Sequence, residues 1–245
     1  TLMKVLCGAY AADAGEFLQR GERIRIHGPA DARRCGIAVI FQEFTLVPYL
    51  DLAQNIFLGR EFRAGIGGRL GMIDSERMHR EARKLLDTLG MDFDTRTPAH
   101  RLGVAQQQLV EIAKALSQDA KILVLDEPTS ALSDRETERL FETIRRLQSQ
   151  GVAMVYISHR LAEVFLLGDR ITVLRDGRKV ASFLPRETTP DALVEAMVGR
   201  KVDTSYGGQA GAQVGEVARV VEPHTAGPLH HRLDDDGGQL VGVRG

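Results

Sequence analysis

Short, nearly continuous runs of apolar residues occur at Gly36–Phe41, Ile122–Leu125 and Ala153–Ile157. A strand of a parallel sheet that is covered on both faces shows this pattern, because neither of its faces meets water. We therefore expect three buried strands. The other predicted strands are Arg23–His27 and the pair Arg170–Arg175 and Arg178–Phe183, which flanks the favoured hairpin turn Asp176-Gly177.

Other segments place apolar residues three or four positions apart, which predicts amphipathic helices. Asp74 or Ser75 can cap the start of one helix, and Gly90 is well placed to end it. Ser133 and Glu136 form a capping-box pattern for a helix that runs to about Gln150. A last helix is expected from Thr189-Pro190 to Gly199. In three other helices the residues expected to face inward are Leu2, Val5, Leu6 and Ala9 in the first, Met78, Ala82, Leu85 and Leu89 in the second, and Leu109, Ile112, Ala113 and Leu116 in the third.

Helices and buried strands alternate over residues 1–200, which predicts an α/β domain. Within it, the glycines and arginines between Gly59 and Gly71 indicate a surface loop. Residues 201–215 are rich in glycine, alanine and glutamine and are typical of a linker. Residues 216–245 contain strand-like pieces, but too few apolar residues to form a core of their own.

Composition adds mild limits. The chain has 245 residues, of which 43% are hydrophobic and 27% charged, as in ordinary globular proteins. Its formal charge of −1 gives no electrostatic reason to expect nucleic acid as a partner. No stretch approaches the roughly 20 apolar residues that span a bilayer, so we expect a cytoplasmic protein. Cys7 and Cys35 lack metal-ligand spacing and are interpreted as reduced thiols.

Polar residues with catalytic potential follow the predicted buried strands. Asp126 and Glu127 come directly after one strand, Gln42 follows another and His159 follows the third. Ligands of α/β proteins bind beyond the carboxyl ends of such strands, where Asp126 could hold Mg²⁺ and Glu127 could orient a water molecule. Each residue also has a purely structural interpretation. Asp126-Glu127 could be the end of a strand followed by a helix cap, Gln42 a glutamine in a surface loop, and His159 a structural histidine.

Several motifs in order identify a family resemblance. Phe41-Gln42-Glu43 resembles the Q-loop, Leu102–Gln108 the signature motif and Ile122–Glu127 the Walker B strand of ATP-binding-cassette (ABC) transporter ATPases. Ser130–Asp134 resembles their D-loop and Ser158-His159 their H-loop. The resemblance covers residues 1 to about 200 and implies a P-loop NTPase-like core with a helical subdomain.

The longer phrases GIAVIFQEFTLVPYLDLAQNIFLGRE and VAQQQLVEIAKALSQDAKILVLDEPTSAL narrow the resemblance. They are similar to the first cassette of tandem ATPases that serve monosaccharide importers of the ribose, galactose and xylose type. Residues 216–245, and Leu240–Val243 in particular, resemble the opening strands of a second cassette that stops before its phosphate loop. The resemblance therefore implies a chain that is truncated at both ends.

This resemblance implies a role for each candidate residue, with ATP and Mg²⁺ as ligands. Asp126 would hold Mg²⁺, Glu127 would be the general base, and His159 would hydrogen-bond the γ-phosphate. Gln42 would contact Mg²⁺ or the attacking water. The residues implied to bind nucleotide are Thr1, which belongs to the chain's own site, and Gly103, Val104, Ala105, Gln106 and Asp134, most of which would face the nucleotide of a partner cassette across an interface.

Two departures from the family pattern limit these roles. The N-terminal strands and the Walker A loop should precede Leu2, and only the final Thr1 of that loop is present. We therefore expect that this chain alone neither binds ATP tightly nor hydrolyses it. Gly103 stands where the family usually has a serine, and losing one charge-assisted hydrogen bond costs about 1.5–3 kcal/mol.

The resemblance implies a subunit that couples ATP hydrolysis to monosaccharide uptake. Its partners would be a membrane permease, contacted through Gln42–Leu52, and a second cassette, with a periplasmic or extracellular sugar-binding protein acting indirectly. Its place would be peripheral, on the cytoplasmic face of the inner membrane. Two alternatives stay open: a non-transport ABC ATPase of translation or DNA repair, and a catalytically incompetent cassette that acts as an interaction module.

Overall fold

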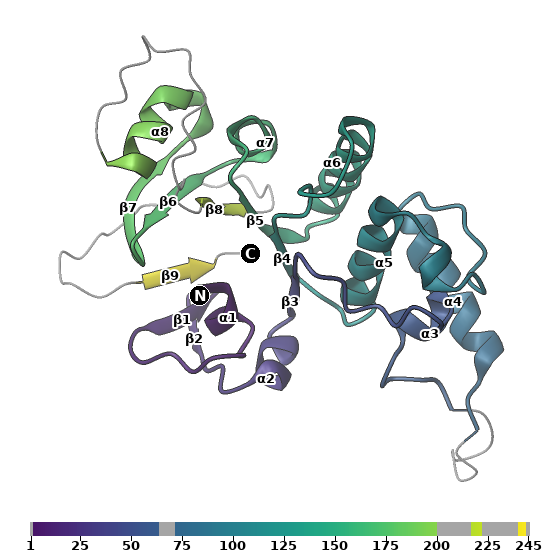
Figure 1. The fold of residues 1–245 in the computed structure, drawn as a ribbon. Helices are drawn as coiled ribbons and strands as arrows, with labels where there is room; N and C mark the ends of the chain where they lie inside the picture. The colour runs from purple at the N-terminus through teal and green to yellow at the C-terminus, as the bar shows by residue number, and fades with distance from the viewer. Residues whose placement is uncertain (1, 64–71, 200–216, 222–239, 244–245) are drawn as a thin grey trace. The chain divides into compact units, whose positions relative to one another are not determined.

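The computed structural model describes residues 2–63, 72–199, 217–221 and 240–243 (Figure 1). Thr1, most of the expected loop at Gly59–Gly71 and the expected linker at 201–215 lie outside these residues.

The described residues form two compact units, and the chain passes from one to the other repeatedly. The first unit takes its residues from Thr1–Val39, Lys121–Glu127 and Leu147–Gly245. The second takes Ile40–Ala120 and Pro128–Arg146. Each unit therefore combines segments that are distant in the sequence.

A six-stranded sheet with the order β3-β4-β5-β8-β6-β7 carries the predicted buried strands. β4 and β5 are parallel, with Val124 opposite Val155, whereas β8 pairs antiparallel with both β5 and β6. β4 and β5 are buried almost throughout, as their continuous apolar runs predict. The strands are β3 (Ile37–Ile40), β4 (Ile122–Asp126), β5 (Ala153–Ser158), β6 (Ile171–Arg175), β7 (Arg178–Phe183) and β8 (Val217–Val221).

A second, smaller sheet has the order β2-β1-β9. β1 (Glu16–Gln19) and β2 (Glu22–Ile24) form a hairpin whose turn is Arg20-Gly21, and β9 (Leu240–Val243) pairs parallel with β1. The strand expected at Arg23–His27 is thus only partly right. Arg20 and Gly21 both have positive φ, 54° and 81°, which reverses the chain earlier than the apolar pattern indicates.

Among the described residues, helices of the first unit contribute apolar side chains to two buried clusters. The helix expected at the N-terminus is present, but Ala9 is exposed, which contradicts its expected inward position. The helix stops early because Gly8 has φ of 74°, and its backbone passes so close to Gly28 that a Cβ atom would clash. These helices are α1 (Leu2–Leu6), α2 (Pro29–Arg34), α7 (Leu161–Leu167) and α8 (Pro190–Val198), with a 3₁₀ turn at Pro185–Glu187.

The clusters in the first unit lie on different elements. One joins α1, α2 and the strands β3, β4 and β5 through Met3, Leu6, Ala32, Ile37, Ile122, Val124, Ala153, Val155 and Ile157, together with Ile26. The other joins α7, β6 and α8 through Val164, Ile171, Val173, Leu193 and Met197. The predicted hairpin turn Asp176-Gly177 and the predicted caps Thr189 and Gly199 of α8 are confirmed.

The second unit is helical. Its α4 begins at the predicted cap Asp74, whose carboxylate accepts a hydrogen bond from the N–H of Arg77, and ends before Gly90. The predicted Ser133–Glu136 pair is also formed, because the Glu136 carboxylate accepts from the N–H and the hydroxyl of Ser133. The helices are α3 (Leu52–Ile56), α4 (Ser75–Thr88), α5 (Val104–Leu116) and α6 (Asp134–Ser149), whose last residues fall in the first unit, with a 3₁₀ turn at Ala99–Arg101.

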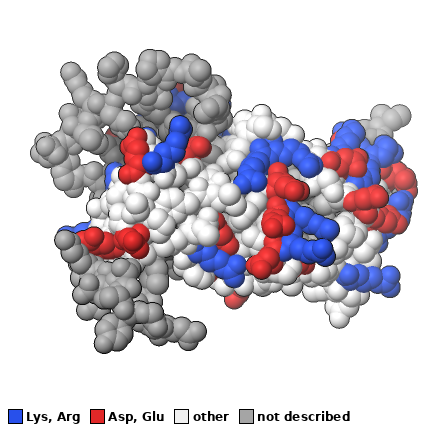
Figure 2. Space-filling model, turned by 90° about the horizontal axis from the view of Figure 1, so that it is seen from above, with Lys and Arg blue, Asp and Glu red and all other residues white. Residues whose placement is uncertain are grey.

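None of the helices in the described part of the chain combines enough length and apolar character to cross a membrane. On the face that Figure 2 shows, the described acidic and basic side chains lie intermixed.

Candidate functional site

Asp126 and Glu127 stand at the carboxyl end of β4. Ile122–Leu125 are buried and fix the strand in the sheet. The half-buried Asp126 is the last residue of the strand, and Glu127 is the first residue beyond it. Glu127 has φ of 45°, a left-handed backbone that is unusual for a residue with a side chain, and its N–H donates to the carbonyl of Ile157 at 3.0 Å. The neighbouring strand thus holds the backbone of Glu127.

His159 meets Glu127 at this edge. β5 runs parallel to β4 with Ile157 opposite Asp126, so His159 lies just beyond the same edge of the sheet. Its Nδ1 is 3.1 Å from Oε1 of Glu127, and the two side chains keep 53% and 31% of their surface exposed. The structure therefore brings together a carboxylate and an imidazole that solvent or a ligand can reach, a pairing suited to proton transfer.

The electrostatics of Asp126 suit a cation. Burial raises the pKa of its carboxyl above the usual value, the negative charge of Glu127 raises it further, and the charge of Lys4 opposes both effects. A divalent cation beside Asp126 would relieve this cost, and Mg²⁺ binds in proteins through one or two carboxylates together with phosphate oxygens and water. Among the residues that the structure describes, no group of three or more His, Cys, Asp or Glu could hold a metal ion.

The nucleotide residue expected at the start of the chain, Thr1, lies outside the described residues. Lys4 lies on α1 with its side chain exposed, and its Nζ is 5.6 Å from the centre of the Tyr10 ring.

The expected signature residues lie in the second unit, at the start of α5. Gly103 is the N-cap residue of this helix, with Val104 at its first position. The side-chain oxygen of Gln106 accepts from the Gly103 N–H at 2.9 Å, so Gln106 itself takes part in the cap. Val104 is exposed, while Ala105 and Gln106 are partly buried. Of the remaining predicted residues in this unit, Gln42 is exposed just after β3 and Asp134 is the exposed first residue of α6.

Sequence reasoning missed two buried polar side chains of this unit that shape the segment after Gln42. Asn55 on α3 is fully buried, accepts from the N–H of Val47 at 2.7 Å and donates to the carbonyls of Val47, Leu50 and Asp51. Glu111 on α5 accepts from the N–H and the hydroxyl of Thr45. The capping box formed by Asp51 and Gln54 was visible in the sequence and would have predicted α3.

These contacts fix a chain segment that presents an aromatic ring. Tyr49 is 83% exposed, and its ring centre is 5.5 Å from that of His100. A shallow hollow of about 260 Å³ lies alongside, lined by Leu46, Pro48, Ala99, His100 and Gln107. An ordered segment with an exposed aromatic is a surface suited to a protein partner.

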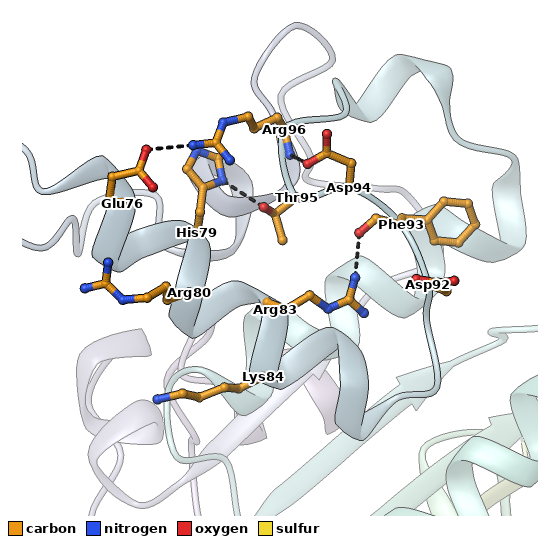
Figure 3. Close-up of a pocket in the computed structure, with 10 residues that line it drawn as sticks. All are labelled: Glu76, His79, Arg80, Arg83, Lys84, Asp92, Phe93, Asp94, Thr95 and Arg96. Atoms are coloured by element: carbon orange, nitrogen blue, oxygen red, sulfur yellow. Dashed lines mark hydrogen bonds and ion pairs between the residues drawn. The ribbon is translucent and has the colours of Figure 1, made fainter.

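A larger hollow of about 550 Å³ on the same unit lies between α4 and the segment that follows it (Figure 3). Several of its polar and charged side chains are paired with one another or with the backbone. Arg96 contacts Glu76 at 2.7 Å, Arg83 donates to the carbonyl of Phe93 at 2.7 Å, and Nδ1 of His79 is 2.9 Å from the Thr95 hydroxyl. These pairs connect α4 to the segment that follows it, and we assign no ligand to the hollow.

Comparison with known proteins identifies the class. The ABC transporter family matches residues 1–130, just over half of the chain, and the chain therefore belongs to that family. Solved ATP-binding cassettes of ABC transporters share its fold. One in an ADP conformation matches with a TM-score of 0.67 and 24% identity, covering 81% of this chain and 82% of the other. A second structure of the same cassette matches with a TM-score of 0.65 and 25% identity, covering 76% of each chain. The predicted α/β ABC ATPase core is thus confirmed.

Curated relatives are more specific. The chain is 47% identical to the ribose import ATP-binding protein RbsA 2 of Streptomyces coelicolor, covering 100% of this chain and 46% of the relative. It is 45% identical to the ribose import ATP-binding protein RbsA of Hahella chejuensis, covering 100% of this chain and 49% of the relative. The chain thus spans about half the length of the curated relatives it matches. The predicted resemblance to ATPases of ribose-type importers is confirmed.

Proposed function

We propose that this chain is part of the ATP-binding subunit of an importer for ribose or a related monosaccharide, in which ATP hydrolysis drives uptake. The names of the relatives support the transported substrate. The observation that carries the chemistry is the contact of 3.1 Å between Glu127 and His159 beside the partly buried Asp126. Membership of the ABC transporter family supports ATP as the nucleotide.

In the proposed reaction the residues of the first unit position a water molecule and the terminal phosphate. Glu127 accepts a proton from the attacking water, and the neighbouring His159 donates a hydrogen bond to the phosphoryl group. Asp126 would hold Mg²⁺, whose charge would offset that of the phosphate oxygens. Since phosphoryl transfer depends chiefly on positioning and electrostatics, these side chains supply the main catalytic contributions of this unit.

The second unit supplies contacts rather than proton transfer. Gln42 follows β3 and would contact Mg²⁺ or the attacking water. The start of α5, with Gly103, Val104, Ala105 and Gln106, presents backbone N–H groups that suit the phosphate of a neighbouring cassette, and Asp134 would lie at the same interface.

The proposed role in an importer also implies partners, domain boundaries and a location. A permease would contact Gln42–Leu52, which the exposed ring of Tyr49 supports. Residues 1–200 would form one cassette, 201–215 a linker, and 216–245 the start of a second cassette with which the first cooperates. A sugar-binding protein outside the membrane would act indirectly, and the subunit would lie peripherally on the cytoplasmic face of the inner membrane. That residues 1–245 alone are inactive stays a prediction.

The test uses the full-length protein that contains this chain, assayed for Mg-ATP hydrolysis. Replacing Glu127→Gln keeps the size of the side chain and removes the base, so turnover should fall at least about 100-fold, the lower limit for general-base catalysis. Glu138→Gln, a change of an exposed glutamate on α6, is the matched control and should leave turnover unchanged. Equal turnover in wild type and Glu127→Gln would refute the proposed site.

Transport is tested separately, with the wild-type protein and its permease in vesicles. ATP-dependent uptake of labelled ribose or a related monosaccharide is expected. Hydrolysis without uptake, and without co-purification of any membrane protein, would favour the non-transport ABC ATPase.

A further inference from the structure

The segment that carries His159 is tied to one buried carboxylate. His159 lies between the end of β5 and the start of α7, and Glu163 on the first turn of α7 is only 5% exposed. Oε2 of Glu163 accepts a hydrogen bond from the Tyr156 hydroxyl at 2.8 Å and another from the Ser158 hydroxyl at 2.8 Å. Two hydroxyls of the strand before His159 thus donate to a single oxygen atom on the helix that follows it.

The tie extends to the other side of His159. The Ser158 hydroxyl, which donates to Glu163, accepts in turn from the N–H of Arg160 at 2.9 Å. The guanidinium of Arg160 lies 3.5 Å from the second oxygen of Glu163. Both residues that flank His159 are therefore held, directly or through one hydroxyl, by Glu163.

A carboxylate in this position is costly unless its hydrogen bonds are made, because burial removes its hydration. Hydrogen bonds to an ionised acceptor are shorter and roughly twice as strong as neutral ones, so they define the position of their donors closely. Arg160, the N-cap residue of α7, makes no side-chain cap hydrogen bond. The conformation of residues 158–160 thus depends strongly on the Glu163 contacts.

We propose that Glu163 is a positioning residue that acts through Ser158 to hold His159 against Glu127. It does not touch the reacting atoms. The catalytic part of this proposal rests on the proposed function, whereas the part that concerns the conformation of residues 158–160 does not. Figure 1 shows the connection involved, from β5 into α7.

The chain offers a matched pair of variants. Ser158→Ala and Tyr156→Phe each remove one buried hydroxyl that donates to the same oxygen of Glu163 at the same distance, 2.8 Å. The Ser158 hydroxyl, in addition, accepts from the backbone N–H of Arg160, the residue next to His159. A purely structural role of Glu163 predicts similar consequences for both variants, and a positioning role predicts different ones.

In the full-length protein we expect kcat for ATP hydrolysis to fall about tenfold in Ser158→Ala and in Glu163→Gln, while KM changes less than about twofold, because small displacements of a catalytic group act mainly on the reaction step. Tyr156→Phe should keep kcat within about twofold. Ser158→Thr retains the hydroxyl and should restore most of the activity.

A second readout needs no nucleotide. Hydrogen exchange of the peptide that contains residues 158–160 should be at least about tenfold faster in Ser158→Ala and Glu163→Gln than in wild type or Tyr156→Phe, because the N–H of Arg160 loses a well-placed acceptor. If Glu163→Gln fails to fold, the Ser158 and Tyr156 variants decide the matter by themselves.

Equal losses of kcat in Ser158→Ala and Tyr156→Phe, or no rescue by Ser158→Thr, would overturn the positioning role. Exchange that is no faster in Ser158→Ala than in Tyr156→Phe would overturn it as well. If instead the exchange difference is found but turnover does not depend on Glu127, the proposed function fails while the conformational role of Glu163 stands.

Discussion

At the scale of single residues, Asp126 and Glu127 both carry a local cost. The backbone of Glu127 is left-handed, which costs roughly 1–2 kcal/mol for a residue with a Cβ atom. Asp126 is partly buried beside a second carboxylate, and its pKa is raised. Such costs gather at functional sites, where the surrounding structure holds residues in positions that they would not adopt alone. The buried strand β4 and the backbone contact to β5 do so here.

The raised pKa of Asp126 has a testable effect on stability. The folded protein binds this proton more tightly than the unfolded chain, so its contribution to folding is most favourable at a pH below the unfolded pKa and is lost as the pH rises through the folded pKa. At pH 7 the ionised Asp126 therefore destabilises the metal-free protein, and Asp126→Asn should raise the thermal unfolding temperature there while abolishing ATP turnover.

The measurement is thermal unfolding of the full-length protein in a chelator at pH 7 and near pH 4. The advantage of Asp126→Asn should shrink at the lower pH. Asp13→Asn, at an exposed position, is the control and should change neither value. An unfolding temperature that drops at pH 7 in Asp126→Asn would contradict the argument.

At the scale of elements, the sequence pattern located those helices and strands that a single local feature marks, such as an apolar run or a capping residue. Continuous apolar runs located β4 and β5, and the caps Asp74 and Thr189 located the starts of α4 and α8. Because β4 and β5 are parallel, Asp126, Glu127 and His159 reach the same edge of the sheet, each at the strand end where the sequence pattern placed it.

Other elements either lacked a local signal in the sequence or carried one that was missed. The β1–β2 hairpin turns at Arg20, and arginine in a left-handed backbone has no sequence signature, unlike the Asp176-Gly177 turn. α3 is only five residues long, too short for helical periodicity to show, although its Asp51–Gln54 capping box could have located its start. Asn55 and Glu163 are of types that are normally exposed, and their burial depends on partners that the fold supplies. The support of the site was therefore harder to predict than the site itself.

Asn55 allows a prediction about one such element. Asn55→Ala removes four hydrogen bonds and leaves part-buried backbone groups of Val47, Leu50 and Asp51 without this partner. We expect a loss of at least about 2 kcal/mol in the free energy of unfolding, since unsatisfied buried groups cost about 1–3 kcal/mol each. Denaturant unfolding and hydrogen exchange of residues 47–51 measure the effect.

Gln54→Ala on the same helix is the control. Gln54 is exposed and takes part only in the cap of α3, so its loss should cost less than about 1 kcal/mol. If both variants lose the same stability, Asn55 does not hold the segment that presents Tyr49.

At the scale of the whole molecule, the candidate functional residues belong to two different units. Asp126, Glu127 and His159 belong to the first, whereas Gln42, Gly103 and Asp134 belong to the second. In the proposed function the first group performs hydrolysis on the chain's own nucleotide, and most of the second group serves a neighbouring cassette. Variants in the two groups should therefore affect different sites of the assembled protein.

Gly103 tests this division. Its φ of −67° and ψ of 164° suit any residue, and an added Cβ atom would meet only Oε1 of Gln106, at 3.9 Å. Gly103→Ser should therefore fold normally and supply a hydroxyl to the phosphate of the neighbouring cassette. We expect ATP turnover of the full-length protein to rise by at least about tenfold, because a hydrogen bond to a charged group contributes about 1.5–3 kcal/mol and about 1.4 kcal/mol corresponds to a factor of ten in rate.

Gly103→Ala adds the carbon without the hydroxyl and should leave turnover near the wild-type value. A rise of equal size in both variants would mean that stiffening of the α5 cap, rather than a phosphate contact, limits turnover. No rise in either would contradict the proposed role of this position.

The place of β8 in the large sheet has one more consequence. β5 and β6 both pair antiparallel with β8, so they run in the same direction as each other with one strand between them. The position between β5 and β6 could hold a strand of either direction, because such a strand would be parallel to both neighbours or antiparallel to both. A strand that replaced β8 and ran parallel to β5 would bring its last residues to the edge where Asp126 and His159 lie, so an exchange of one strand would suffice to bring a new loop to the site.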